Sequence, residues 1–531
     1  MWDAVQLSRT PTTYAVASRS AGREALRALE SRLRTRRDSG TSRHETYYDT
    51  FDWRLHRDGD TLTSTTSDGS WLLTWRASDG AARQQITGSE TPGFAWDLPG
   101  GPFRDALASR VEMRRLLPMV ELESESPTLR VLDAEQKTIA RIELELASAS
   151  PPGDTAAARA LAPRIRVVPV TGYDRAFDQV VSIVEADLGL QRDETDDLTR
   201  ALAGIGKAPG SYTSKFRLTL DPGMPAGEAA RQIHRALLET MLANEDGVRQ
   251  DVDTEFLHDF RVSVRRTRSC LGQIKGVFPP EPVEKFRKEF AWIGTLTGPT
   301  RDMDVYLLKM DDYRSTLPEA VQRDLRPLEE FLRRHQEIEH NKLTAGLDSS
   351  RYPDLIRHWR EFLGAPLPDD PALPGAKRPV REVASERIAR CFRRVLKKGR
   401  AIKDDSPPAR LHRLRIECKK LRYLLEFFRS LYDPHDVEPV VKSLKRLQDN
   451  LGDFNDLQIQ RETLKRFAQE MVAEDCATVE SLMAMGRLVE RLEVRQVKER
   501  SRFTKRFAEF DALPMRERFA RGIHRPEGTA S

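Results

Sequence analysis

Apolar residues recur at helical spacing through the second half of the chain, and one such pattern occurs twice. The segment that starts at Leu257 reads LHDFRVSVRRTR, and the segment that starts at Leu411 reads LHRLRIECKKLR. An offset of 154 residues (412 − 258) relates the two histidines, and the same offset brings Gly298 onto Gly452. A repeat at a fixed spacing indicates two copies of one structural unit.

Each repeated segment is predicted to be a helix that carries its cations on one face. A helix turns by about 100° per residue, which places the cations in a stripe about 80° wide. The stripes consist of His258, Arg261, Arg265 and Arg268 in the first copy, and of His412, Arg415, Lys419 and Arg422 in the second. The apolar face borders each stripe, so we expect these cations at the edge of a packed seam.

The composition of the stripes favours an anion as ligand. No acidic residue lies within either stripe, and like charges one turn apart destabilise a helix. Arginine matches phosphate oxygens with a planar fork, and lysine adds a point charge. A solvated basic face is the usual alternative for one such stripe, and a histidine satisfied in the core is the alternative for His258 and His412. Two copies with equal spacing favour the anion site.

Further cations are candidates for the same site. Arg266 and Lys420 follow the stripe residues directly, and Lys288 and Lys442 correspond at the same offset. Arg394 belongs to a basic cluster between Arg390 and Arg400 that has no equal in the first copy. That cluster either extends the anion site or forms a solvated face.

The glycines and aspartates that the offset of 154 residues relates are predicted to mark helix ends. Gly298 and Gly452 follow amphipathic segments and suit the position just after a helix. Asp302 and Asp456 then suit the start of the next helix. Asp302 with Asp304 could hold a metal, although capping and pairing with Arg301 is the simpler interpretation.

The first 200 residues have a different pattern. Aromatic and β-branched runs at 47–55 and 61–66 flank an Asp-Gly turn at 58–59, and residues 130–145 read as strand, turn and strand. Such runs indicate antiparallel hairpins. A helix is expected at 21–36 and an exposed loop at 147–163. We therefore predict an α+β domain built on an antiparallel, tunnel-like barrel, followed by an all-α region.

Composition limits the class of protein. The 531 residues are 32% charged and 39% hydrophobic, with a formal net charge of only +5. A modest net charge fits a local anion site better than a general polyanion coat. The four cysteines form no Cys-x-x-Cys pair, and no apolar stretch approaches the roughly 20 residues that span a bilayer. We expect a cytoplasmic protein with no membrane contact, no metal and no cofactor.

The repeated motifs resemble those of the CHAD family. They are the two histidine segments, the segment LTGPTRDMDV from Leu296 and the segment LQDNLGDFND from Leu447. The resemblance covers residues 213–515 and implies two four-helix bundles related by pseudo-twofold symmetry. It also implies that inorganic polyphosphate binds in a basic channel between them, without a defined catalytic chemistry. Association with polyphosphate granules would follow from such a ligand.

The N-terminal region resembles the CYTH family, the triphosphate tunnel fold. The segments YDTFDWRL from Tyr48 and WLLTWR from Trp71 carry the resemblance. Active members use a Glu-x-Glu-x-Lys motif on the first strand to hold a metal, but the corresponding segment from Tyr14 reads YAVASR. Arg76, Glu143 and Glu145 remain where the family has charged residues. Glu121, Glu123 and Glu125 could compensate, although a solvated strand face is the simpler interpretation.

The predicted organisation has four parts. Residues 1–202 form a catalytically inactive CYTH-like domain, 203–212 a linker, 213–515 the CHAD domain and 516–531 a tail. Within the CHAD domain, copies at 213–363 and 380–515 flank a Pro-rich spacer at 364–379. The leading hypothesis is non-catalytic binding of inorganic polyphosphate. The alternatives are a metal-dependent triphosphatase in the first domain and nucleic-acid binding by the basic helices, which the lack of stacking aromatics beside the stripes makes unlikely.

Overall fold

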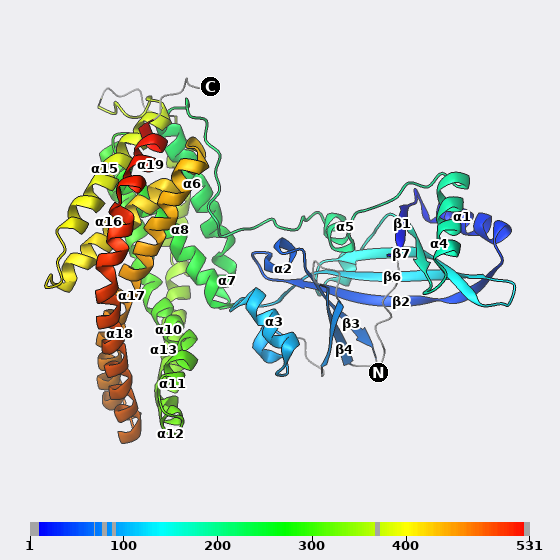
Figure 1. Cartoon of the computed structure of the whole chain (residues 1–531), viewed down its shortest axis with the longest axis horizontal. Helices are drawn as coiled ribbons and strands as arrows, with labels where there is room; N and C mark the ends of the chain where they lie inside the picture. Colours follow the sequence, from blue (N-terminus) through cyan, green and yellow to red (C-terminus); the bar gives the residue numbers. More distant parts are fainter. Residues whose placement is uncertain (1–9, 68–69, 77–81, 88–91, 367–371, 525–531) are drawn as a thin grey trace. The chain divides into compact units, whose positions relative to one another are not determined.

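The computed structural model describes residues 10–67, 70–76, 82–87, 92–366 and 372–524. The chain divides into two compact units, Met1–Ser214 and Lys215–Ser531 (Figure 1). The first unit is built on an antiparallel sheet, and the second is entirely helical. This confirms the predicted fold class. No helix among the described residues combines the length and the apolar character that a bilayer crossing requires.

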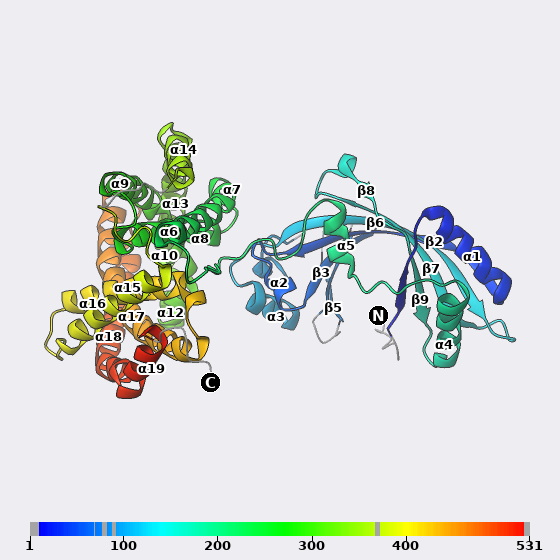
Figure 2. The ribbon, with the colours of Figure 1, turned by 90° about the horizontal axis from the view of Figure 1, so that it is seen from above.

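One twisted sheet organises the first unit. Its strands are β1 (Thr12–Ala15), β2 (Thr35–Asp49), β3 (Thr61–Ser67), β4 (Ser70–Arg76), β5 (Ala82–Thr87), β6 (Leu117–Leu132), β7 (Thr138–Ser150), β8 (Arg159–Ala160) and β9 (Arg164–Pro169). The strand order is β1-β9-β7-β6-β2-β3-β4-β5, with β8 beside β7. The sheet curves strongly (Figure 2), and among the described strands its hydrogen-bonded path has β1 and β5 at its ends.

Helices cover both faces of this sheet. They are α1 (Arg19–Arg32), α2 (Arg54–Arg57), α3 (Pro102–Val111), α4 (Asp174–Ser182) and α5 (Asp197–Gly204). Successive residues of a strand point to opposite faces. On β7, Ile142 and Leu144 join the apolar cluster of α1 and α4. Ala147 and Ala149 pack instead with Leu198 of α5, so the two faces have separate cores.

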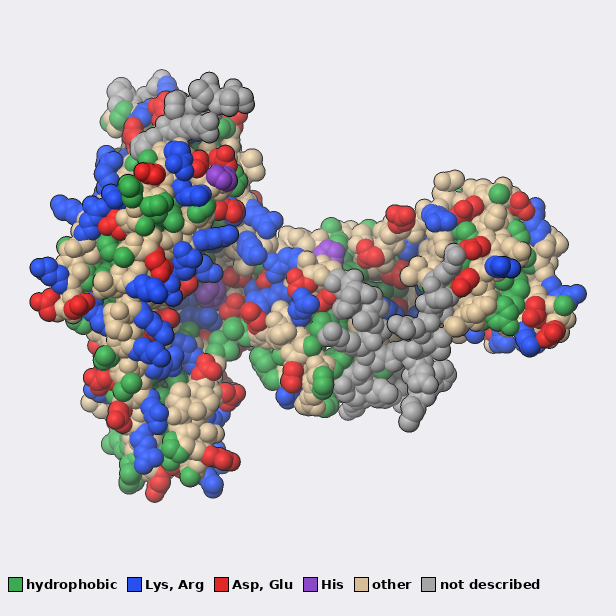
Figure 3. Space-filling view, in the orientation of Figure 1, with side chains coloured by type: hydrophobic (Ala, Val, Ile, Leu, Met, Phe, Trp, Pro, Cys, Tyr) green, Lys and Arg blue, Asp and Glu red, His purple; other side chains and the backbone are tan. Residues whose placement is uncertain are grey.

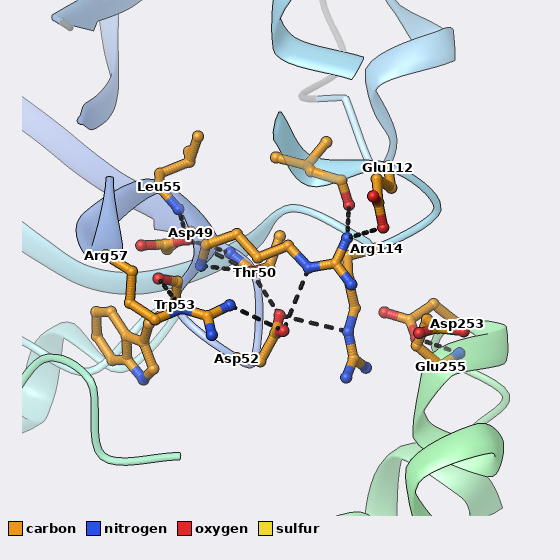
Figure 4. A network of polar contacts seen from close by, with 12 residues as sticks. Asp49, Thr50, Asp52, Trp53, Leu55, Arg57, Glu112, Arg114, Asp253 and Glu255 are labelled. Atoms are coloured by element: carbon orange, nitrogen blue, oxygen red, sulfur yellow. Dashed lines mark hydrogen bonds and ion pairs between the residues drawn. The ribbon is translucent and has the colours of Figure 1, made fainter. Parts of the chain in front are cut away.

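A compact polar network fixes the corner between β2 and α2. The Asp49 carboxylate accepts hydrogen bonds from the backbone N–H groups of Thr50, Leu55 and His56, at 2.7, 3.0 and 2.9 Å (Figure 4). Trp53 adopts the left-handed conformation there, with φ 59°. Burial raises the pKa of Asp49 to about 6. The network turns the chain so that β3 returns antiparallel to β2, which confirms this predicted hairpin.

Three predicted boundaries in the first unit need correction. The first helix begins at Arg19 and ends at Arg32, because the chain enters β2 at Thr35. The expected loop at 147–163 is mostly structured, since β7 continues to Ser150 and β8 pairs with it. The linker predicted at 203–212 begins inside α5, which ends at Gly204.

The helices of the second unit reproduce the offset found in the sequence. They are α6 (Ala226–Ala243), α7 (Glu245–Arg249), α8 (Thr254–Gln273), α9 (Pro280–Leu296), α10 (Gly298–Leu308), α11 (Met310–Ser315), α12 (Glu319–Gln322), α13 (Arg326–Asp348), α14 (Arg351–Gly364), α15 (Val380–Arg400), α16 (Pro408–Phe427), α17 (Pro434–Ala473), α18 (Val479–Asp511) and α19 (Leu513–His524). The first residues of α6, α8 and α9 lie one offset before those of α15, α16 and α17. Residues 367–371 of the predicted spacer lie outside the described residues.

Reciprocal hydrogen bonds join the two copies just before α6 and α15. The N–H of Ala226 donates to the carbonyl of Arg378 at 2.9 Å, and the N–H of Val380 donates to the carbonyl of Met224 at 2.9 Å. Donors and acceptors in the two bonds are related by the repeat offset. Pro225 and Pro379, which are also equivalent, form the bridge between these bonds. An interface in which each residue meets its own equivalent is the signature of a twofold axis.

The two copies also share their apolar cores. One cluster joins residues of α6 and α8 to residues of α15, α16 and α17. Another joins α10 and α13 to the C-terminal half of α17 and the N-terminal half of α18. Phe519 and Ile523 of α19 are buried in the first of these clusters. The prediction of a tail at 516–531 is therefore wrong for residues 516–524, because these apolar side chains complete the core.

Gly298 follows the end of α9 as predicted, since α9 ends at Leu296 and Thr297 is its C-cap, but Gly452 does not end a helix. Gly298 begins α10, because Thr297 keeps helical dihedral angles and the chain continues directly from α9. Gly452 and Asp456 lie inside α17, a helix of 40 residues. Leu447, Leu451 and Phe454 continue its buried face, which explains why no break occurs there.

Gly399→Ala tests the packing between α15 and α18. A Cβ atom at Gly399 would lie 1.9 Å from the Phe507 ring. Alanine normally stabilises a helix relative to glycine by about 0.5–1 kcal/mol, but overpacking a core costs about 1–3 kcal/mol. We expect the variant to be destabilised by about 1–2 kcal/mol, as measured by thermal unfolding. Gly486→Ala on α18, where a Cβ meets nothing within 4 Å, should be stabilising. Equal shifts in both variants would contradict this packing.

Candidate anion-binding site

The two basic helices, α8 and α16, are brought together in the second unit. Asp253 caps α8 by accepting hydrogen bonds from the N–H groups of Glu255 and Phe256, and α16 begins at Pro408, which needs no N–H partner there. Cys270 of α8 and the buried face of α16 join one apolar cluster. Arg266 of α8 contacts Glu426 of α16 at 2.9 Å. Their polar edges consequently lie side by side.

A cavity of about 240 Å³ lies where the two stripes meet. Three helices line it: α8 with His258, Val262, Arg265 and Arg266, α16 with Arg415, Lys419, Arg422 and Tyr423, and α17 with Gln448, Asp449 and Gly452. We call it the central cavity. Lys and Arg side chains gather over the middle of the helical unit around a hollow that holds a histidine (Figure 3). Six of the predicted binding residues therefore share one cavity.

Part of the positive charge is neutralised by neighbouring acids, which the sequence did not reveal. Glu426 accepts hydrogen bonds from Arg266 at 2.9 Å and from Arg422 at 2.6 Å. Asp456 pairs with Arg415 at 3.0 Å. The expectation that no acid compensates the stripes was wrong, because Glu426 lies one turn beyond the second stripe and Asp456 comes from another helix.

Arg265 and Lys419 form no ion pair among the described residues, although both line the central cavity. They occupy equivalent positions in the two copies. Burial, together with repulsion by Arg415 and Arg265, lowers the pKa of Lys419 to about 8, against a smaller opposing effect of Asp456. Two uncompensated cations meet across the repeat, where an anion would relieve their repulsion.

Equivalent contacts hold the histidines in both copies. The Nδ1 atom of His258 lies 3.2 Å from Arg301, and that of His412 lies 2.6 Å from Asn455. Both partners follow their histidine by 43 residues. His258 lines the central cavity, whereas His412 is exposed and does not. The constant spacing of these partners is a signal that the sequence carried.

Arg261 has a different role from the one expected. Its guanidinium donates to the carbonyl of Gly294 at 3.0 Å and to the Thr297 hydroxyl at 2.6 Å. Burial lowers its pKa to about 10, and the neighbouring Arg265 and Arg301 contribute to the shift. These bonds tie α8 to the end of α9, and the side chain does not line the central cavity.

Gln448 is a residue of the cavity that sequence reasoning did not single out. Its side chain is 8% exposed, and neither amide atom has a hydrogen-bond partner in the described structure. An unsatisfied buried amide is costly unless a ligand or water meets it. Its equivalent in the first copy is Gly294, so the two sides of the cavity differ here.

The other predicted residues lie elsewhere. Arg394 and Lys420 line a second cavity. Arg268, Lys288 and Lys442 are exposed and line neither cavity. Whether they contact a long ligand stays a prediction.

Asp302 and Asp304, the acidic pair of α10, follow Arg301 in the chain. Burial raises the pKa of Asp304 to about 7, against the attraction of Arg301. No group of three or more potential metal ligands occurs among the described residues.

Comparison with known families identifies the helical unit. Residues 232–465 match the family described as the CHAD domain. The chain carries a CHAD domain. It is similar to the solved CHAD domain from the plant Ricinus communis, at 27% identity over 56% of this chain and 96% of that chain, with a TM-score of 0.47. PptA from Streptomyces chartreusis is 18% identical over 53% of this chain and 99% of that chain, with a TM-score of 0.41.

Other comparisons concern the first unit. A proposed adenylate cyclase from Bacillus halodurans is 17% identical over 35% of this chain and 92% of that chain, with a TM-score of 0.25. Comparison with curated proteins finds no match.

The charged residues of the first unit are paired with one another. Glu145 bonds Arg200 at 2.6 Å and lies 3.7 Å from Arg166. Burial raises the pKa of Glu45, a residue that sequence reasoning missed, although Arg43 and Arg76 oppose the shift. The segment of β1 carries no carboxylate. On β6, Glu123 and Glu125 are exposed, as a solvated strand face requires.

Lys419→Met in the CHAD domain should stabilise the ligand-free protein. The folded pKa of Lys419 is about 8, below the ordinary 10.5, so the charged form opposes folding at neutral pH. This penalty fades as pH rises from about 8 towards 10.5. We expect a gain of about 1 kcal/mol at neutral pH, discounted for partial exposure, that shrinks over this window. Thermal unfolding as a function of pH measures it.

Lys420→Met is the matched control for this variant. Lys420 follows Lys419 directly and donates to Glu417 at 3.3 Å, so its loss should lower stability. A gain for Lys420→Met as large as that for Lys419→Met would contradict the assignment of the repulsion.

Proposed function

We propose that the CHAD domain binds inorganic polyphosphate in the central cavity without catalysing a reaction. The presence of a CHAD domain in this chain supports a role connected with polyphosphate in general. The observation that carries the specific proposal is the pair of equivalent cations, Arg265 and Lys419, that share the cavity without ion-pair partners among the described residues. An anion between them would remove the repulsion that lowers the pKa of Lys419.

The pseudo-twofold arrangement suits a linear polyphosphate. Such a chain presents the same phosphate group at each step and the same chemistry in either direction. A cavity that offers equivalent cations from both copies can therefore bind it in both orientations. Arg266, Arg415 and Arg422 are held by acids, so their positions are fixed before the ligand arrives, which reduces the entropy lost on binding.

The geometry disfavours nucleic acid as the ligand. Base recognition by basic grooves usually needs aromatic rings on which bases stack. Tyr423 is the one aromatic residue that lines the central cavity, and its ring already stacks with Phe427 at 6.3 Å. Phosphate groups alone then remain as the recognised feature.

We infer that the first unit is a scaffold and not a triphosphatase. Hydrolysis of a triphosphate relies on a metal that stabilises charge on the phosphate oxygens. The carboxylates expected on β1 are absent from Thr12–Ala15, and Glu145 is bonded to Arg200. A cytoplasmic location and association with polyphosphate granules stay predictions that follow from the proposed ligand.

The double variant Arg265→Glu, Lys419→Glu should lose long-chain polyphosphate. Each substitution removes a phosphate contact and adds repulsion, and we expect affinity to fall by more than about 100-fold. Binding of the wild type should weaken steeply with added salt through counter-ion release. Titration calorimetry of the full chain measures both effects.

Arg393→Glu, Arg487→Glu is the control for this pair. Both arginines are exposed and line neither cavity, while the change in net charge is the same. Unchanged affinity in the Arg265→Glu, Lys419→Glu protein, with helical circular dichroism intact, would show that the site lies elsewhere.

Competition between polyphosphate and RNA should separate the two ligand classes. At equal phosphate concentration and equal salt, polyphosphate is expected to displace RNA from the full chain, because the central cavity recognises phosphate and offers no stacking platform. Fluorescence anisotropy of labelled RNA measures the displacement. RNA that resists an equal concentration of polyphosphate would favour the nucleic-acid alternative.

A further inference from the structure

A second basic cavity lies on another face of α16. Its volume is about 220 Å³, and five cations line it: Lys275, Arg387, Arg390, Arg394 and Lys420. No acidic residue is among the described residues that line it. Lys419 and Lys420 are consecutive, so their side chains diverge by about 100° around the helix axis. The second cavity is therefore separate from the central cavity although both use α8 and α16.

The carboxylates nearest to these cations are already engaged. Glu386 accepts a hydrogen bond from Arg378 at 2.6 Å. Glu417 accepts from Lys398 at 2.8 Å and from Lys420 at 3.3 Å. This leaves the three arginines of α15 without a carboxylate between them.

Arg387 is positioned at the wall of the cavity by the end of α8. Its guanidinium donates to the carbonyl of Lys275 at 2.8 Å. Its Nε atom is buried and has no hydrogen-bond partner in the described structure. Burial lowers the pKa of Arg387, and repulsion by Arg390 adds to the effect. A buried, fixed donor beside like charges is the arrangement that an anion would satisfy.

The first copy lacks equivalents of the three arginines that line this cavity. Ile233, Ala236 and Thr240 of α6 stand where α15 has its three arginines. Glu426 stands where α8 has Gly272, and it neutralises Arg266, the equivalent of Lys420. The second cavity consequently breaks the pseudo-twofold symmetry of the CHAD domain.

We propose that the second cavity is a separate site for a compact phosphate anion, such as pyrophosphate. The five cations converge on this space from α15, from α16 and from Lys275 just after α8, so several of them can bind one short anion at once. Arginine forks from α15 would bind the oxygens bidentately, while Lys275, just after α8, and Lys420 of α16 would add charge. This assignment rests on the cavity itself and does not require that the central cavity binds polyphosphate.

The test uses the full chain and pyrophosphate. Because pyrophosphate can also enter the central cavity, the background is the Arg265→Glu, Lys419→Glu protein. Titration calorimetry should show that this background binds pyrophosphate at one site. Adding Arg390→Glu and Arg394→Glu should weaken the binding by at least about 10-fold, since two phosphate contacts become repulsive. Adding Arg393→Glu and Arg487→Glu should leave it within about twofold.

Three results would overturn the proposal. The first is that the background protein binds no pyrophosphate. The second is that the quadruple variant with Arg390→Glu and Arg394→Glu binds pyrophosphate as tightly as the background. The third is that Arg390→Gln and Arg394→Gln, introduced into the wild type, weaken binding of long-chain polyphosphate but not of pyrophosphate. The last result would make the cavity an extension of the central one. Arg390 and Arg394 are exposed, so circular dichroism should confirm that the variants fold. Whether the background protein loses long-chain polyphosphate tests the central cavity, whereas its pyrophosphate binding tests the second cavity. Either proposal can therefore fail without the other.

Discussion

The arrangement of the second unit depends on the pairing of equivalent backbone segments before α6 and α15. Because the N–H of Ala226 meets the carbonyl of Arg378 while that of Val380 meets the carbonyl of Met224, the two copies must be related by a twofold operation. Equivalent helices then lie beside their own counterparts. A shared apolar cluster holds them there, and the proximity of α8 and α16 follows from this constraint.

A twofold relation also concentrates charge. A cation near the axis meets its own equivalent, so one basic position in the repeated unit gives two cations at one place. Arg265 and Lys419 are such a pair, and the pKa of Lys419 is lowered by burial first and then by repulsion from Arg415 and Arg265. The neighbouring arginines are instead neutralised by Glu426 and Asp456. Within the central cavity, the cations without an ion pair among the described residues are Arg265 and Lys419, where the proposed ligand would lie.

The repeat offset and the helical wheel predicted much of this arrangement, because both depend on local geometry. The positions of α8 and α16 and the shared face of His258 and Arg265 follow from spacing alone. The wheel could not show that Arg261 would bind the end of α9, since its partner comes from another helix. The same reason hid Gln448 and the compensation by Glu426. The helix end expected at Gly452 does not occur, because the buried face of α17 continues past it.

The residues that differ between the two copies indicate where their surfaces have different functions. Positions that pack in both copies, such as the seam of α8 and α16, are fixed by the shared core. Elsewhere the copies differ: in the repeat, Ile233 corresponds to Arg387, Gly272 to Glu426 and Gly294 to Gln448. Arg387 and Gln448 thereby line the two cavities, and Glu426 accepts hydrogen bonds from two arginines of the central cavity. A duplicated fold therefore supplies two related surfaces, of which one can keep the symmetric ligand while the other acquires a smaller site.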